Sequence, residues 1–381
     1  MLARHRNLLA AAAENVARNA RGYLVAASGL VLALTLLLAG VAISEGLRAE
    51  ALGAVRAGAD VYVTWDRFGR DVPVPRDRVA ELASIDGVVA AVPRIVGRVP
   101  LGERLAVVVG VPRERLADAP VDVRGALPAS AEEVLLGHEL ARALGLHPGS
   151  TIALDGETLR LFTVSGVVSA TSSFWSAKAV ICDLEEAAVV FGDPDHVTDV
   201  CLITRAGYEG LVAEAVERRD SRFRVQTRGL VERYVVRGMT TREGVFTVLF
   251  ALALALAIPS FAIMTWLGRT PRRREIGLLK AEGWKTTDVL EMVAWENLIV
   301  SLFAAGAALL FALIWVRLLR APGIAPFFLP DLPEFPGLRI PARFTPVPPL
   351  LAFLFSFAVT MTGSIWSTWR TAITRPADVL R

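Results

Sequence analysis

The chain has 381 residues, of which 54% are hydrophobic and only 21% are charged. This composition is too apolar for an ordinary soluble domain and too charged for a bundle lying wholly in lipid, so it indicates a protein with membrane-spanning and soluble parts. The net charge is only +3, and the basic residues lie mostly beside apolar segments, which excludes nucleic acid as the natural partner and points to the lipid bilayer.

The first 44 residues combine a basic amphipathic segment with a long uncharged one. Residues 1–21 are basic, and we expect them to form a helix on the inner membrane surface. Its apolar side chains recur at helical spacing: Leu8, Leu9, Ala12 and Val16. Residues 22–44 carry no charge and predict the first membrane span. A cleaved signal peptide is the alternative, although its apolar core is normally about 7–15 residues and lies nearer the start.

Residues 45–244 differ in character, because charge returns and Gly and Pro interrupt the apolar runs. This pattern predicts a large α+β domain outside the membrane, inserted between the first two spans. We expect two lobes: lobe A from about 45–126 plus 195–244, and lobe B from about 127–194. The expected strands are 59–65, 88–99, 105–111, 151–154, 159–168, 179–182, 199–204 and 223–227, and the expected helices are 76–84, 138–144, 184–191 and 208–219.

Two features of this domain leave alternatives open. Cys182 and Cys201 each sit in a β-like apolar run, so they form either two buried free thiols or a disulfide. Phe174 and Trp175 lie in the sequence TSSFWSAK and are either an exposed contact for a partner or substrate or an anchor of the core.

Three further apolar segments, 245–267, 292–316 and 348–366, predict the remaining spans of a four-helix membrane protein. Pro259 in the second span predicts a kink, which serves either as a hinge or as a packed bend. Glu296 lies at the edge of the third span, where it either faces Lys285 or an arginine in the headgroup layer or couples an ATPase to the bundle.

The connections between these spans differ in charge and in proline content. Residues 268–291 are strongly basic, which predicts that this segment and both termini, the tail at 367–381 included, are cytoplasmic. The outer loop at 317–347 contains seven prolines, from which we expect neither a helix nor a central strand. Phe327 and Phe328 keep this loop apolar and are candidate contacts for a partner or substrate.

Several motifs resemble one family. Residues 274–284 read REIGLLKAEGW and closely resemble the coupling segment of FtsX-like ABC-transporter permeases, a family of macrolide- and peptide-exporter, lipoprotein-releasing and cell-division permeases. The run LLGHELARALGLHPGSTIAL at residues 135–154 is similar to another element of the family, with Ser150 in place of its usual Asp. The tail TWRTAITRPADVLR resembles the family's ending, and the large first loop resembles the exporter and lipoprotein-release branch.

The resemblance implies that the basic segment seats in a groove of a cytoplasmic ATPase. The implied coupling residues are Arg274, Glu275, Ile276, Leu279, Lys280 and Gly283. By helical spacing, Ile276, Leu279 and Gly283 share one face, whereas Leu278 and Lys280 turn elsewhere.

No G-x-x-x-x-G-K-[ST] motif occurs in these 381 residues, so we expect a separate ABC ATPase subunit to bind ATP and Mg. The chain itself is expected to bind no cofactor or metal and not to be catalytic alone. Four spans make half of a transport unit, so a dimer with itself or with a homologous permease is expected. The resemblance adds a membrane-fusion-type adaptor as a further partner and the bacterial cytoplasmic membrane as the location.

The expected function is that of a permease subunit, in which ATP hydrolysis moves the outer domain and a substrate is exported, or extracted from the periplasm or the outer leaflet. The rival is a mechanical regulator, in which the same motion activates an extracytoplasmic hydrolase and nothing is transported. The identity of a neighbouring gene, an adaptor or a secreted hydrolase, would separate the two.

Overall fold

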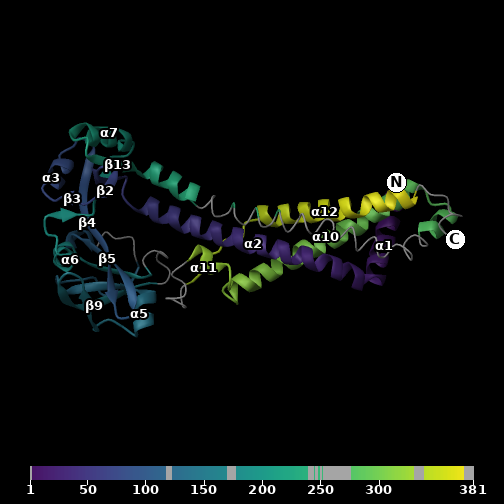
Figure 1. The fold of residues 1–381 in the computed structure, drawn as a ribbon, viewed down its shortest axis with the longest axis horizontal. Helices are drawn as coiled ribbons and strands as arrows, with labels where there is room; N and C mark the ends of the chain where they lie inside the picture. Colours follow the sequence, from purple (N-terminus) through teal and green to yellow (C-terminus); the bar gives the residue numbers. More distant parts are fainter. Residues whose placement is uncertain are drawn as a thin grey trace. The chain divides into compact units, whose positions relative to one another are not determined.

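A computed structural model of the chain describes residues 2–116, 122–169, 177–238, 276–329 and 339–372, together with residues 244, 248 and 251. The chain divides into two units (Figure 1). The helical unit comprises Met1–Gly46, Thr240–Phe328 and Ala342–Arg381, and the sheet unit comprises Leu47–Met239 and Leu329–Pro341.

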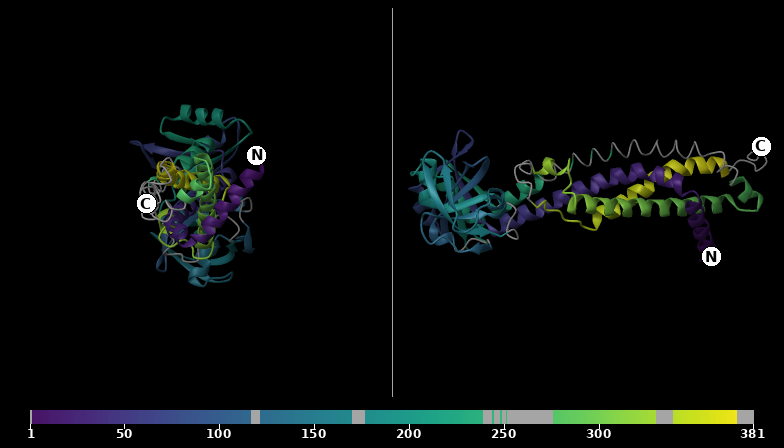
Figure 2. Two further views of the ribbon diagram at one scale, coloured as in Figure 1. Left: turned by 90° about the vertical axis from the view of Figure 1, so that its right-hand side faces the viewer. Right: turned by 90° about the horizontal axis from the view of Figure 1, so that it is seen from below.

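Helices make up most of the described part of the helical unit. The long ones are α1 (Leu2–Arg18), α2 (Ala20–Ala57, which continues into the sheet unit), α10 (Thr286–Arg317) and α12 (Val347–Ala372). Helix α11 (Ala325–Phe328) and the helical residues 276–281 are short. Helices α10 and α12 pack side by side, and α1 turns sharply away from α2 at Asn19 and packs on α10 (Figure 2). Prolines 348 and 349 fall in the first turn of α12, where the missing N–H groups need no helical partner.

Among the described residues, two helices, α2 and α10, are long and apolar enough to cross a membrane. They contain the predicted first and third spans, and α2 stays helical well beyond residue 44. The predicted second span, with Pro259, lies almost entirely outside the described residues. The predicted fourth span lies within α12. Four membrane helices therefore stay a prediction.

The outer loop contains a helix that we did not expect. Helix α11 (Ala325–Phe328) forms one turn within the segment whose prolines were taken to forbid helix, and that expectation is wrong. Pro326 stands in the first turn, where proline's fixed φ is compatible with a helix and its lack of an N–H costs nothing.

The sheet unit is built on one continuous sheet of eleven strands, in the order β13-β1-β12-β4-β5-β10-β7-β9-β6, with β2 beside β1 and β8 beside β9. A separate two-stranded sheet pairs β11 with β3. The strands are β1 (Val61–Arg67), β2 (Arg70–Val72), β3 (Val74–Pro75), β4 (Val88–Leu101), β5 (Arg104–Val111), β6 (Val123–Gly125), β7 (Glu133–Gly137), β8 (Thr151–Asp155), β9 (Leu159–Val168), β10 (Ala179–Asp183), β11 (His196–Val197), β12 (Asp199–Thr204) and β13 (Phe223–Thr227).

Strand β4 joins the two halves of this sheet. Its first half, Val88 to Arg94, pairs antiparallel with β12, and its second half, Ile95 to Leu101, pairs antiparallel with β5. Pro93 is tolerated because β4 has a neighbour on only one side at that point. Strands β5 and β6 pair with β10 and β9, so they join the sheet of the expected lobe B although they precede residue 127; the division into lobes stays a prediction.

The helices that accompany the sheet include α3 (Arg78–Ala83), α4 (Arg113–Leu116), α5 (His138–Leu144), α6 (Leu184–Phe191) and α7 (Glu209–Arg219), and residues 228–238 are helical as well. Helix α6 shows why the sequence folds here: the Asp183 side chain caps its first turn by accepting from the Glu185 N–H, and Gly192 ends it in the left-handed conformation. Helices α3, α6 and α7 pack on the sheet, and one apolar core runs between them (Figure 1).

Both cysteines are buried and free. Cys182 lies on β10 and Cys201 on β12, with β4 and β5 between these strands. Three strand spacings amount to about 14 Å, far beyond the reach of a disulfide. The structure therefore favours the free-thiol alternative.

Candidate functional site

The first candidate site is the segment that leads into α10. Residues 276–281 are helical, and Gly283 ends this helix with a φ of 94°. The Trp284 N–H donates to the Leu279 carbonyl at 3.1 Å, and the Gly283 N–H donates to the Lys280 carbonyl at 3.1 Å. These two bonds form a Schellman turn, which satisfies carbonyls at the helix end and requires a residue that tolerates positive φ. The sequence placed the break correctly at Gly283.

The structure separates Leu278 from Ile276 and Leu279, as the helical spacing predicted. Ile276 is 3% exposed and packs against Val289 of α10, with Trp284 beside them. Leu279 and Lys280 are half-buried, whereas Leu278 is 54% exposed. The resemblance implied that Ile276 contacts an ATPase, but the chain's own α10 covers this side chain. The exposed apolar side chain is Leu278.

Helix α1 contacts the first turns of α10 through two pairs of basic and acidic side chains. The Lys285 N–H donates to the Asp288 carboxylate at 3.1 Å, which caps the start of α10. Asp288 also pairs with Arg4 of α1, and one turn further on Glu291 pairs with His5. Asp288 thus caps the start of α10 and also contacts α1.

Glu296 is the most deeply buried carboxylate in this region, at 1% exposure. Its Oε1 accepts from the Asn15 amide at 2.6 Å, and its Oε2 accepts from the Tyr23 hydroxyl at 3.0 Å. The sequence left two roles open for Glu296, a pair with Lys285 or an arginine in the headgroup layer or a coupling role. Among the described residues, the structure places Asn15 of α1 and Tyr23 of α2 against it. Asn15 and Tyr23 were missed, although Asn15 follows Leu8 and Ala12 on the same face of α1 and interrupts an apolar stripe.

Several predicted site residues fall outside the described residues: Pro259, Arg274, Glu275, Phe174 and Trp175. Phe327 and Phe328 of α11 are described, with ring centroids 5.5 Å apart in an edge-to-face arrangement. Phe328 is buried and Phe327 is 48% exposed, so of these two only Phe327 offers an open contact surface.

A second candidate site lies in the sheet unit around Trp65. A pocket of about 510 Å³ opens beside its ring. Phe223 meets Trp65 edge to face at 4.9 Å, and the guanidinium groups of Arg222 and Arg78 lie 4.7 Å and 5.9 Å from the indole centre. The pocket is lined by Trp65, Asp66, Arg67, Val72, Pro73, Pro75, Asp193, His196 and Arg222.

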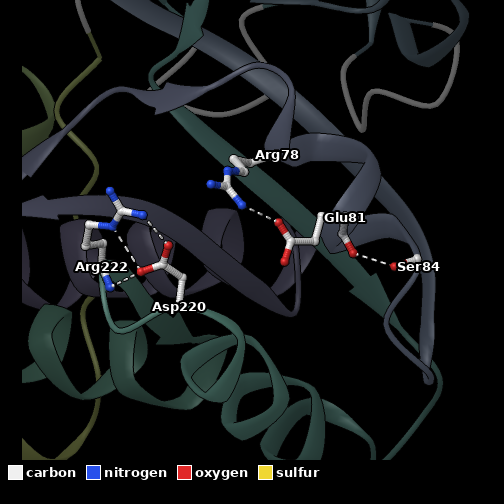
Figure 3. A network of polar contacts seen from close by, with 5 residues as sticks. All are labelled: Arg78, Glu81, Ser84, Asp220 and Arg222. Carbon is white, nitrogen blue, oxygen red and sulfur yellow. Dashed lines mark hydrogen bonds and ion pairs between the residues drawn. The ribbon is translucent and has the colours of Figure 1, made fainter.

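Both guanidinium groups are held by carboxylates (Figure 3). Arg78 donates to Glu81 at 2.9 Å, while Arg222 forms two side-chain bonds to Asp220, of 3.0 Å and 2.7 Å. The hydrogen bond from the Arg222 side chain lowers the pKa of Asp220 to about 2, so this carboxylate is ionised at any physiological pH. Asp220 is therefore not a candidate general acid at this surface.

The described residues contain no group of three or more His, Cys, Asp or Glu side chains that could hold a metal ion. In the same part of the chain, burial raises the pKa of each cysteine to about 12, so neither is an activated nucleophile.

Two family models match the chain. The FtsX-like permease C-terminal domain matches residues 247–376, and the MacB-like periplasmic core domain matches residues 23–220, which is more than half of the chain. The chain belongs to the FtsX-like, MacB-type permease family. This confirms the resemblance on which the sequence interpretation rests, and it makes the chain a membrane protein and a membrane subunit rather than an enzyme. No curated protein sequence matches this chain.

Two solved structures similar to part of the chain are periplasmic or extracellular regions. The periplasmic region of MacB from Actinobacillus actinomycetemcomitans is 14% identical, with 49% of this chain and 97% of that chain covered and a TM-score of 0.37. The extracellular domain of the noncanonic ABC-type transporter YknZ from Gram-positive bacteria is 13% identical, with coverages of 44% and 99% and a TM-score of 0.35.

Proposed function

We propose that this FtsX-like permease is the membrane subunit of an ABC transporter whose separate cytoplasmic ATPase, carrying ATP and Mg, drives motion of the periplasmic core domain. That motion exports a substrate or extracts it from the periplasm or the outer leaflet. The observation that carries the proposal is Leu278, an exposed apolar side chain on a helix that a Schellman turn joins to α10. Such a residue gains by packing into a protein groove.

The geometry of the segment supports a coupling role. Ile276 and Trp284 pack the short helix onto Val289, so a push on the helix reaches α10 without passing through a loose loop. Arg274 and Glu275 precede the helix and are proposed as rim charges, which orient a partner more than they add affinity. A dimer with itself or a homologous permease, an adaptor of membrane-fusion type, and location in the bacterial cytoplasmic membrane with both termini inside belong to the same proposal.

Co-purification of the ABC ATPase with Leu278 variants tests this function. Leu278→Asp should lower recovery of the ATPase at least tenfold, because burial of a leucine is worth about 1.5–3 kcal/mol. Leu211→Asp is the matched control, because Leu211 of α7 is 59% exposed on a helix of the sheet unit and should leave recovery unchanged. Lys285→Ala should keep most of the complex.

Two outcomes would contradict the proposal in different ways. Full recovery of the ATPase with Leu278→Asp would show that the partner does not dock on this helix. An ATPase complex that moves no substrate but activates an extracytoplasmic hydrolase would make the chain a mechanical regulator.

A further inference from the structure

A buried polar cluster joins α1, the elbow at Asn19 and α10. Asn15 is 4% exposed and Glu296 is 1% exposed, so both polar side chains are inside the helical unit. Asn15 donates to Glu296 at 2.6 Å and accepts from the Asn19 amide at 2.8 Å. Tyr23, in the first turns of α2, donates to the second oxygen of Glu296 at 3.0 Å.

The cluster fixes each member in one orientation. A buried carboxylate is tolerated only when its oxygens are hydrogen-bonded, and replacement of Asn15 removes one of the hydrogen bonds that Glu296 accepts. The bond from Asn19 sets which end of the Asn15 amide faces Glu296, because only the NH₂ group donates. Asn15 is therefore the donor that ties α1 to the carboxylate of α10.

Apart from Asn15, α1 meets α10 through buried apolar side chains and through partly exposed polar ones. Leu8 and Ala12 are buried on the same face as Asn15, at i, i+4 and i+7. This is part of the stripe that was expected to lie on the membrane surface. At the other end of α1, the ion pairs Arg4–Asp288 and His5–Glu291 involve half-exposed side chains, and such pairs contribute little stability. The buried contact of Asn15 is thus the specific one.

We propose that Asn15 is a positioning residue for the segment that meets the ATPase: through Glu296 it holds α1 on α10, so that the N-terminal helix moves with the coupling helix instead of resting on lipid. This inference rests on the proposed function for its consequence, because the segment held in place is the one on which the ATPase would act. The contact itself exists without any ATPase and is tested separately.

The contact is measured by cross-linking the full-length chain in membranes. His5 and Glu291 are each replaced by cysteine, and a short bismaleimide joins the two new thiols. Chains that carry only one of the new cysteines show any reaction with the two buried native thiols. In this background, Asn15→Leu should lower the cross-linked fraction at least about fivefold, because the buried hydrogen bond between α1 and α10 is then lost. Asn7→Leu is the matched control, an exposed asparagine on the same helix, and should keep the wild-type fraction.

A double variant separates the polar contact from general damage to α1. Asn15→Leu combined with Glu296→Leu replaces both ends of this hydrogen bond by apolar side chains. It should raise cross-linking at least about twofold above the single variant, although Tyr23 and Asn19 each lose a hydrogen-bond partner. If Asn15→Leu does not accumulate in the membrane, Tyr23→Phe removes one hydroxyl donor from the same carboxylate and should lower cross-linking at least about twofold.

The same variants are then purified with the ATPase, and ATP hydrolysis by the complex is measured. Asn15→Leu should reduce it at least about fivefold and the double variant should recover part of it. Wild-type cross-linking by Asn15→Leu, a double variant no better than the single one, or unchanged hydrolysis despite lost cross-links would each overturn the proposal. A wild-type chain that binds no ATPase would refute the proposed function, and with it the role of Asn15 in coupling, while the cross-links would still report whether Asn15 holds α1.

Discussion

The two thiols of the sheet unit show how burial sets residue chemistry. Burial raises the pKa of Cys182 and of Cys201 to about 12, although Arg94 beside Cys201 acts in the opposite direction. Three pKa units above the usual value leave about a thousandfold less thiolate at neutral pH, and the thiolate is the reactive form.

We therefore expect a maleimide at pH 8 to modify neither cysteine of the folded chain, and to modify both at once in urea, as counted by mass spectrometry. The raised pKa also favours the folded state below about pH 9, and this contribution is lost as the pH rises toward 12. The urea midpoint of a Cys182→Ala, Cys201→Ala chain should accordingly fall less steeply than that of wild type between pH 9 and 11. Rapid labelling of the folded protein, or loss of both thiols through an intramolecular disulfide, would contradict this.

At the scale of elements, the seat of α6 on β5 depends on one missing side chain. A Cβ on Gly110 would lie 2.3 Å from the Cβ of Ala187. A Cβ is bonded directly to the backbone, so no side-chain rotation can relieve this clash. Gly110→Ala should therefore lift α6 from the sheet and destabilise the sheet unit by about 1–3 kcal/mol. The measurement is pulse proteolysis in urea of the full chain in detergent.

Gly210→Ala is the matched control for this prediction. Gly210 lies in α7, and a Cβ there would meet nothing within 4 Å. Alanine in a helix is favoured over glycine by up to about 1 kcal/mol, so this variant should be as stable as wild type or more so. Equal shifts of the two midpoints would mean that α6 does not sit on β5 as described.

Helices and strands with long periodic patterns were predictable from sequence. Helices α5 and α6 and strands β9, β12 and β13 begin and end where expected, because each has a regular apolar period bounded by turn or capping residues. Strands β2, β3, β6, β7 and β11 were missed. All of them except β7 have only two or three residues, which carry no period, so such strands form only through distant partners. Helix α11 was missed because Pro326 was treated as a breaker rather than as a first-turn residue.

The candidate site was predictable in position but not in detail. The motif at residues 274–284 locates the coupling helix, and Gly283 locates its end. The resemblance placed Ile276 against an ATPase, because a motif does not reveal that α10 folds back over that side. Asn15 and Tyr23 precede Glu296 by 281 and 273 residues, so only the fold brings them to it.

At the scale of the whole molecule, the proposed topology assigns opposite sides to two exposed residues. Asp155 lies on β8 in the periplasmic core domain, and Lys285 precedes α10. In intact cells, a membrane-impermeant maleimide should label Asp155→Cys and leave Lys285→Cys unlabelled, because basic segments between spans stay in the cytoplasm. Lys285→Cys should become reactive once the cells are permeabilised; labelling in the reverse order would overturn the orientation and with it the ATPase proposal.

The shared strand β4 limits how this domain can recombine with its relatives. A breakpoint after residue 126 would transfer β7, β9 and β10 but leave behind β5, the parallel neighbour of β10, so a foreign edge would have to match it. Breakpoints between Arg94 and Ile95 and just before β12 transfer the second half of β4 together with the strands on that side of the sheet, β5, β10, β7, β9, β6 and β8. Exchange among homologues is therefore expected to preserve residues 95–198 as one heritable block.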